Sequence, residues 1–229
     1  MNSWLRGLVD LVFPPECHIC EVGLAPGEKF ICRACAAELP RTGFHRIAMN
    51  PVEERFAGQF PFERATSLFF YTKNSPLSQL IQDMKYRSYP GIGILLGEMA
   101  AKELFSTGFF ADIDVVTSVP MHWYKKARRG YNQSERIAVG IGQTLNLPVA
   151  EMLKMRRPRK TQTRLSEIER LKNADNLFQP LPDPAFNNKG VLLVDDICTT
   201  GTTLGSAAAT LMKEWPDVRL SLLTIGTTF

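Results

Sequence analysis

The residue types best suited to chemistry lie in one segment, Val191-Leu-Leu-Val-Asp-Asp-Ile-Cys-Thr-Thr-Gly-Thr-Thr203. Its apolar start predicts a buried strand, and two adjacent carboxylates, Asp195 and Asp196, follow at the carboxyl end of that strand. Two neighbouring carboxylates can accept hydrogen bonds from the hydroxyls of a vicinal diol. The next loop offers backbone N–H groups, threonine hydroxyls and a helix N-terminus, which favour a phosphate, and Gly201 allows a close backbone approach.

A diol beside a phosphate describes a ribose 5-phosphate. The alternative is a polar turn in which Asp196 or Thr199 simply caps the following helix. Capping accounts for one Asp or Thr, but not for two acids and four threonines around one glycine. The segment therefore predicts a ribose 5-phosphate site.

Four of the five cysteines form two pairs, Cys17-x-x-Cys20 and Cys32-x-x-Cys35, with eleven residues between the pairs. Each turn can place two thiolates on one side of a zinc ion, and two turns complete a closed tetrahedral site. Two disulfides or free thiols are the alternatives, but disulfides require an oxidising compartment and we find no targeting segment. We expect structural zinc held by Cys17, Cys20, Cys32 and Cys35, with His18 and His45 as bystanders.

Positive charge is concentrated in one stretch of the chain. The net charge is +4, yet residues 120–172 carry 13 Lys and Arg against 4 Asp and Glu, a local excess of +9. Such a stretch suggests an anionic ligand. Because Trp123, Tyr124 and Tyr131 lie among these charges, and bases stack on aromatic rings beside a basic groove, single-stranded DNA is one candidate.

The overall composition is that of a globular protein. The 229 residues are 45% hydrophobic and 22% charged, which excludes disordered, collagen-like and disulfide-scaffold classes. No apolar run is long enough to span a membrane. Residues 4–12 have helical spacing interrupted by Arg6 and Asp10, so an amphipathic docking helix is favoured over a signal peptide, and membrane-surface binding is disfavoured. We expect a cytoplasmic protein.

Helical and extended patterns alternate after residue 65, which argues for an α/β fold with a parallel sheet flanked by helices. In such sheets ligands bind beyond the carboxyl ends of the strands. We expect a domain at 63–229 and, at 1–62, an N-terminal helix, the zinc module and a linker with small strands. Strands are predicted over 66–72, 114–119, 149–155, 190–195 and 219–225, and helices over 75–86, 92–105, 133–145, 166–173 and 202–214.

The segment around Asp195 closely resembles the phosphoribosyl pyrophosphate (PRPP) signature of the type I phosphoribosyltransferase family. The resemblance implies that Asp195 and Asp196 contact the ribose hydroxyls. It implies that the 5-phosphate lies on the following loop, formed by Cys198, Thr199, Thr200, Gly201, Thr202 and Thr203. Cys198 stands where the family usually has an aliphatic or small residue, so we expect a small buried side chain there.

Two further stretches resemble the ComF/GntX branch of these proteins. Residues 118–133 resemble its VP-x-H…RG-F/Y-NQ signature, and residues 156–166 with Arg170 and Asn173 resemble its second basic block. The four-cysteine module is also typical of ComF proteins. The resemblance implies that the first stretch faces the pyrophosphate, through Ser118, Val119, Pro120, His122, Arg129, Gly130, Asn132 and Gln133. It implies that the second forms a mobile basic loop, with Arg159, Lys160, Thr163, Arg164 and Arg170.

Three functions are open. One is regulatory, with PRPP or a nucleotide acting only as a ligand that binds without turnover, and two others follow from the resemblance. The first is a PRPP-binding protein that handles single-stranded DNA during competence, with the zinc module orienting a partner such as a DNA-translocation helicase. The alternative is an active transferase in which Mg²⁺–PRPP loses pyrophosphate to a nitrogen acceptor. Three roles stay open for His122: it carries a proton, it donates a hydrogen bond to a phosphate, or it is structural. The sequence does not decide whether turnover occurs.

Overall fold

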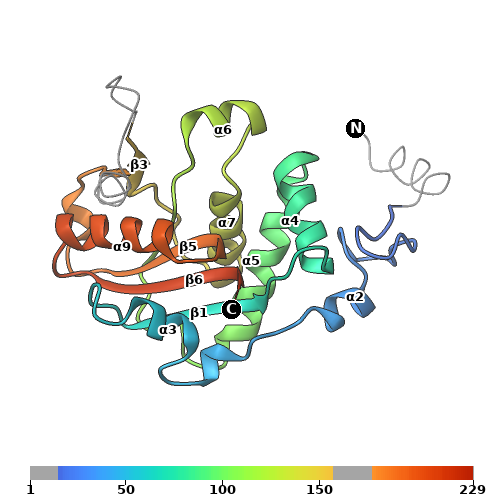
Figure 1. Ribbon diagram of the computed structural model, residues 1–229, viewed down its shortest axis with the longest axis horizontal. Helices are drawn as coiled ribbons and strands as arrows, with labels where there is room; N and C mark the ends of the chain where they lie inside the picture. Colours follow the sequence, from blue (N-terminus) through green and yellow to red (C-terminus); the bar gives the residue numbers. More distant parts are fainter. Residues whose placement is uncertain (1–14, 157–176, 229) are drawn as a thin grey trace.

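A parallel sheet forms the centre of the computed structural model, which describes residues 15–156 and 177–228. Its four strands lie in the order β1-β6-β5-β2 (Figure 1). Their bounds are β1 (Arg64–Phe70), β2 (Val115–Ser118), β5 (Gly190–Cys198) and β6 (Arg219–Thr227). Each neighbouring pair is parallel, with Val191–Val194 of β5 opposite Val115–Ser118 of β2. The carboxyl ends of the four strands therefore meet at one edge of the sheet.

Each face of the sheet has its own hydrophobic core. Leu192 and Val194 face the core shared with α4 (Pro76–Tyr86), α5 (Pro90–Phe105) and α7 (Gln133–Leu145). Val191 and Leu193 face the core shared with α3 (Pro51–Phe56) and α9 (Thr202–Glu214). A strand covered on both faces needs a continuous apolar run, as β5 has. The predicted parallel sheet with helices on both faces is confirmed.

Helices α5 and α7 pack closely through two glycines. A Cβ on Gly140 would lie 2.1 Å from the carbonyl oxygen of Ile94, and one on Gly97 would lie 2.2 Å from that of Ile137. Without a side chain, glycine lets the two backbones approach this closely. The contact holds α7 against the sheet, with its first turn at the edge where β2 ends.

The segment between the cysteines and β1 differs from its prediction. Instead of a linker with small strands, it contains α2 (Arg33–Glu38), a 3₁₀ turn η1 (Phe44–Arg46) and α3. Asn50 begins α3 because its side chain accepts the N–H groups of Val52 and Glu53, while Glu53 bonds back to the Asn50 N–H. Phe56 then packs in the core beneath α9. The domain division at residue 62 stays a prediction.

The remaining elements lie around the main sheet. A second sheet pairs β3 (Leu153–Met155) antiparallel with β4 (Phe178–Pro180), so the strand predicted over 149–155 is shorter. A 3₁₀ turn, η2 (Pro184–Phe186), precedes β5. Helix α6 (Trp123–Arg129), in a segment predicted as a loop, has no buried residue and projects beyond the sheet (Figure 1).

Two predicted helices, over residues 4–12 and 166–173, lie outside the described residues. Within residues 15–156 and 177–228, no helix combines the length and the apolar character needed to cross a bilayer.

Candidate functional site

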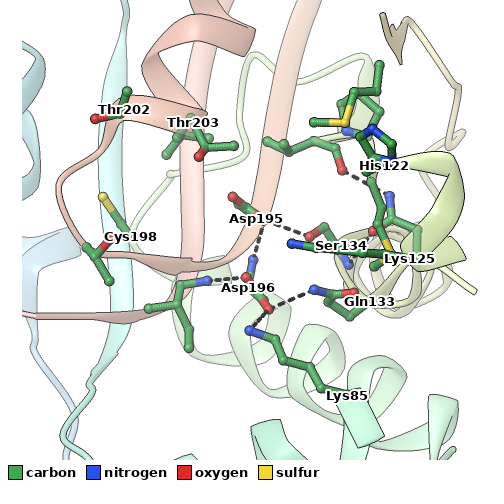
Figure 2. Close-up of a pocket in the computed structure, with 18 of the residues that line it drawn as sticks. Lys85, His122, Lys125, Gln133, Ser134, Asp195, Asp196, Cys198, Thr202 and Thr203 are labelled. Atoms are coloured by element: carbon green, nitrogen blue, oxygen red, sulfur yellow. Dashed lines mark hydrogen bonds and ion pairs between the residues drawn. The ribbon is translucent and has the colours of Figure 1, made fainter. Parts of the chain in front are cut away.

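A pocket of about 360 Å³ opens at the carboxyl ends of β2 and β5. It brings together the acidic pair, the threonine loop and most of the residues that follow β2 (Figure 2). Of the predicted site residues, these line it: Val119, Pro120, His122, Arg129, Asn132, Gln133, Asp195, Asp196, Cys198, Thr199, Thr200, Gly201, Thr202 and Thr203. Ser118 and Gly130 lie next to it in the chain without lining it.

The two acidic side chains have different partners. Asp195 accepts two hydrogen bonds on its Oδ1, from the Ser134 hydroxyl at 2.7 Å and from the Asp196 backbone N–H at 2.9 Å. Asp196 is bound on both oxygens. Its Oδ2 lies 2.6 Å from Lys85 Nζ and 3.1 Å from Gln133 Nε2, and its Oδ1 accepts the Ile197 N–H at 2.8 Å. Asp195 is therefore the carboxylate that the protein leaves more open to a ligand.

Burial and the neighbouring charge of Asp196 raise the pKa of Asp195 to about 7. The Ser134 hydroxyl, the Asp196 N–H and the Lys85 ammonium act in the opposite direction, because each favours the ionised carboxylate. A carboxyl that titrates near neutrality at the floor of a pocket is a mark of a functional site.

The loop after β5 has the backbone that a phosphate needs. Gly201 adopts a left-handed φ of 80° at the start of α9, and a Cβ there would lie 2.9 Å from the Phe56 ring. Glycine is therefore required by both conformation and space. Thr202 and Thr203, the first residues of α9, line the pocket (Figure 2). The first N–H groups of a helix have no partner inside it and favour an anion.

Cys198 is buried at the end of β5, as the sequence predicts for a small filler. Burial raises the pKa of its thiol. Arg55 of α3 donates to the Cys198 sulfur at 3.3 Å and to the Thr228 carbonyl at 2.9 Å. This arginine ties α3 to the ends of β5 and β6, beneath the threonine loop.

The chain after β2 is held to the site by α7. Asn132 begins α7 by accepting the Ser134 N–H, and its amide donates to the Val119 carbonyl at 2.9 Å. Arg129 donates to the Gln133 side chain. His122 begins α6, where its Nδ1 accepts the Tyr124 N–H at 3.3 Å. The bonds of Asn132 and Gln133 thus connect the loop after β2 directly to the acidic pair.

Several residues that line the pocket are absent from the predicted site, among them Lys125, which lies within the 118–133 stretch. Ser134 lies one residue beyond the recognised signature, and Lys85 and Tyr86 lie at the end of α4, about 110 residues before the acidic pair. The amphipathic pattern predicts the helix but cannot say what its last turn meets. The predicted mobile-loop residues Arg159, Lys160, Thr163, Arg164 and Arg170 lie outside the described residues.

The four predicted zinc ligands converge. Their sulfur atoms lie within 4.8 Å of one another, and the Cys20 and Cys32 sulfurs are 3.7 Å apart. Zn–S bonds of about 2.3 Å in a tetrahedron require sulfurs about 3.8 Å apart, so the cluster fits zinc. No disulfide joins these cysteines. Burial and the neighbouring thiols raise the pKa of Cys35, a cost that a bound cation would relieve.

Comparison with known proteins gives a family match for the cysteine-bearing segment and relatives that align with most of the chain. Residues 8–45 match the double zinc ribbon domain family. The DNA utilization protein YhgH of Salmonella typhimurium is 28% identical over 218 residues, covering 89% of this chain and 93% of that protein. Competence protein F of Haemophilus influenzae is 30% identical over 143 residues, covering 60% of this chain and 62% of that protein.

The chain is a homologue of YhgH and Competence protein F. These relatives confirm the predicted resemblance to ComF proteins. The double zinc ribbon match and the four convergent sulfurs support structural zinc. Among solved structures, the glutamine PRPP amidotransferase from B. subtilis aligns with 62% of this chain and 30% of that chain, at 21% identity and a TM-score of 0.42.

The raised pKa of Asp195 predicts a pH-dependent stability. A carboxyl that binds its proton more tightly when folded stabilises the fold at low pH, and that contribution is lost as pH rises from about 4 to about 7. Asp195→Asn should therefore raise the free energy of unfolding by about 1–3 kcal/mol at pH 8. Denaturant unfolding should show a much smaller difference at pH 5.

The matched control is Asp217→Asn, which removes one exposed carboxylate before β6 without touching the pair and should leave the free energy of unfolding unchanged at both pH values. Equal stability of Asp195→Asn and the native protein at pH 8 would show that ionising the Asp195 carboxyl carries no cost in the folded state.

Proposed function

We propose that the pocket binds PRPP or a related ribose 5-phosphate, and that the protein handles single-stranded DNA during DNA uptake. The observation that carries the proposal is the convergence of an acidic pair and a glycine-centred threonine loop at one sheet edge. One group suits sugar hydroxyls and the other suits a phosphate. The names of the homologues, DNA utilization protein and Competence protein, supply the DNA role.

In this proposal each part of the pocket binds a different part of the ligand. Asp195 accepts a hydroxyl of the ribose on the carboxylate oxygen that Ser134 does not occupy. The loop from Thr199 to Thr203 holds the 5-phosphate through backbone N–H groups and hydroxyls. His122, Lys125 and Arg129 line the side from which a pyrophosphate would approach, and Mg²⁺ carried by PRPP would offset the phosphate charge.

Helix α6 is the surface that suits a nucleic acid strand. Trp123 and Tyr124 are 59% and 58% exposed. Lys125 and Arg128 make no ion pair within the described part of the chain. Tyr131, also expected to stack on bases, is half-buried and its hydroxyl donates to the Met84 carbonyl. The stacking surface therefore consists of Trp123 and Tyr124, without Tyr131.

Loss of the acidic pair should abolish ligand binding. In calorimetric titrations with PRPP and Mg²⁺, the double variant Asp195→Asn/Asp196→Asn should bind at least about 100-fold more weakly than the native protein, because both anionic acceptors are lost. Asp217→Asn, an exposed change before β6 at the opposite edge of the sheet, is the matched control. Equal affinity of the double variant and the native protein would overturn the proposed site.

Removal of one aromatic ring and one cation from α6 should weaken single-stranded DNA binding without changing the residues that line the pocket. Trp123→Ala/Arg128→Ala should reduce the affinity for a fluorescent oligo-dT at least about tenfold. The dependence of log affinity on log salt concentration should also become shallower, its negative slope shrinking in magnitude by about 0.7, because one phosphate contact is lost. The control Phe105→Ala/Lys102→Ala removes one exposed ring and one cation from the end of α5. Equal losses in the two variants would mean that α6 has no special role.

A further inference from the structure

The last turn of α4 connects four parts of the molecule through consecutive residues. Asp83 contacts the zinc module, the Met84 carbonyl accepts the Tyr131 hydroxyl, Lys85 contacts Asp196, and the Tyr86 ring lies under the Arg129 guanidinium. Figure 1 shows the cysteine-bearing segment beside α4, on the side away from the sheet. A displacement of this turn would therefore change the pocket.

The contact between α4 and the zinc module is a buried polar one. His18 Nδ1 lies 2.7 Å from Asp83 Oδ2, and Asp83 is only 2% exposed. Arg87, its second charged neighbour, is at 3.4 Å and largely exposed. A buried carboxylate is costly unless it is paired and hydrogen-bonded, so the His18 contact is the main compensation for Asp83.

His18 is itself fixed by the metal site. It lies inside the Cys17-x-x-Cys20 turn, both ends of which would be bound to zinc, so its backbone has little freedom when the metal is present. Its ring packs edge-on against Tyr89, with centroids 4.5 Å apart. Beside it, the Phe30 ring covers Gly91, where a Cβ would lie 2.4 Å from the ring. The zinc module thus contacts both the last turn of α4 and the start of α5.

On the other side of the same turn, Lys85 reaches the acidic pair. Its ammonium lies 2.6 Å from Asp196 Oδ2, and Figure 2 shows it entering from α4, opposite the threonine loop. Lys85 lies two residues after Asp83 on the same helix. The place of its ammonium in the pocket therefore depends on where the zinc module holds Asp83.

We propose that His18 is a positioning residue for the pocket: through Asp83 it holds the last turn of α4, and so Lys85, against the acidic pair. Zinc binding at the cysteines and ligand binding at the pocket are then coupled, and each strengthens the other. The inference rests on the proposed binding of PRPP, which serves as the probe ligand.

The test compares three variants of the full chain, all checked for one bound zinc and for thermal unfolding. His18→Ala removes the contact and should weaken PRPP binding about tenfold. His18→Asn keeps a donor at the place of Nδ1 and should recover most of the affinity. Lys29→Ala, an exposed change in the same module, should bind like the native protein.

A double-mutant cycle separates positioning from general destabilisation. In a Lys85→Met background, His18→Ala should cause little further loss of affinity, because both changes act through the same ammonium. Additive losses, or native affinity in zinc-loaded His18→Ala, would overturn the inference.

A second readout needs no ligand. Because the Lys85 ammonium favours the ionised form of Asp195, the pKa of the Asp195 carboxyl should rise in His18→Ala when followed by carboxyl ¹³C NMR. An unchanged pKa would contradict the inference. If the native protein does not bind PRPP, the proposed function fails, but this pKa still decides the positioning role of His18.

Discussion

The constraint on which the structure depends is the placement of two adjacent carboxylates at the end of a buried strand. Like charges that are close together and partly removed from water cannot both ionise cheaply. The fold meets this cost unequally. Asp196 receives an ammonium, an amide and a backbone N–H, whereas Asp195 receives a hydroxyl and a backbone N–H and keeps a pKa near neutrality. This asymmetry makes Asp195 the group that a ligand can best satisfy.

The surrounding elements are arranged to supply those partners. Helix α7 provides Ser134 and Gln133 from its first turn, and it is held there by the glycine contact with α5. Helix α4 provides Lys85 from its last turn, held by the zinc module. The metal site, although distant in sequence from the pocket, is thus part of the scaffold that sets its charge balance. A small module with little apolar material can do this because zinc fixes its turns.

The sequence predicts the sheet, its main helices and the convergence of the acidic pair with the threonine loop, because apolar periodicity and strand direction are local properties. It does not predict Lys85 or His18 as site-related residues, since their roles arise only when α4 packs between two segments far apart in the chain. It also misses α2, α3 and α6. These helices are short and carry too few apolar residues to show a period, and α3 depends on the reciprocal bonds of Asn50 and Glu53.

The most direct measurement of the central claim compares ribose 5-phosphate with 2-deoxyribose 5-phosphate by calorimetric titration of the native protein. Both ligands offer the same phosphate to the loop from Thr199 to Thr203, but only ribose offers a second hydroxyl to the acidic pair. If the pair recognises a diol, the deoxy compound should bind about tenfold more weakly or worse, as expected for a lost hydrogen bond to a charged group. Equal affinities would contradict the account, because the carboxylates would then have no part in recognising the sugar.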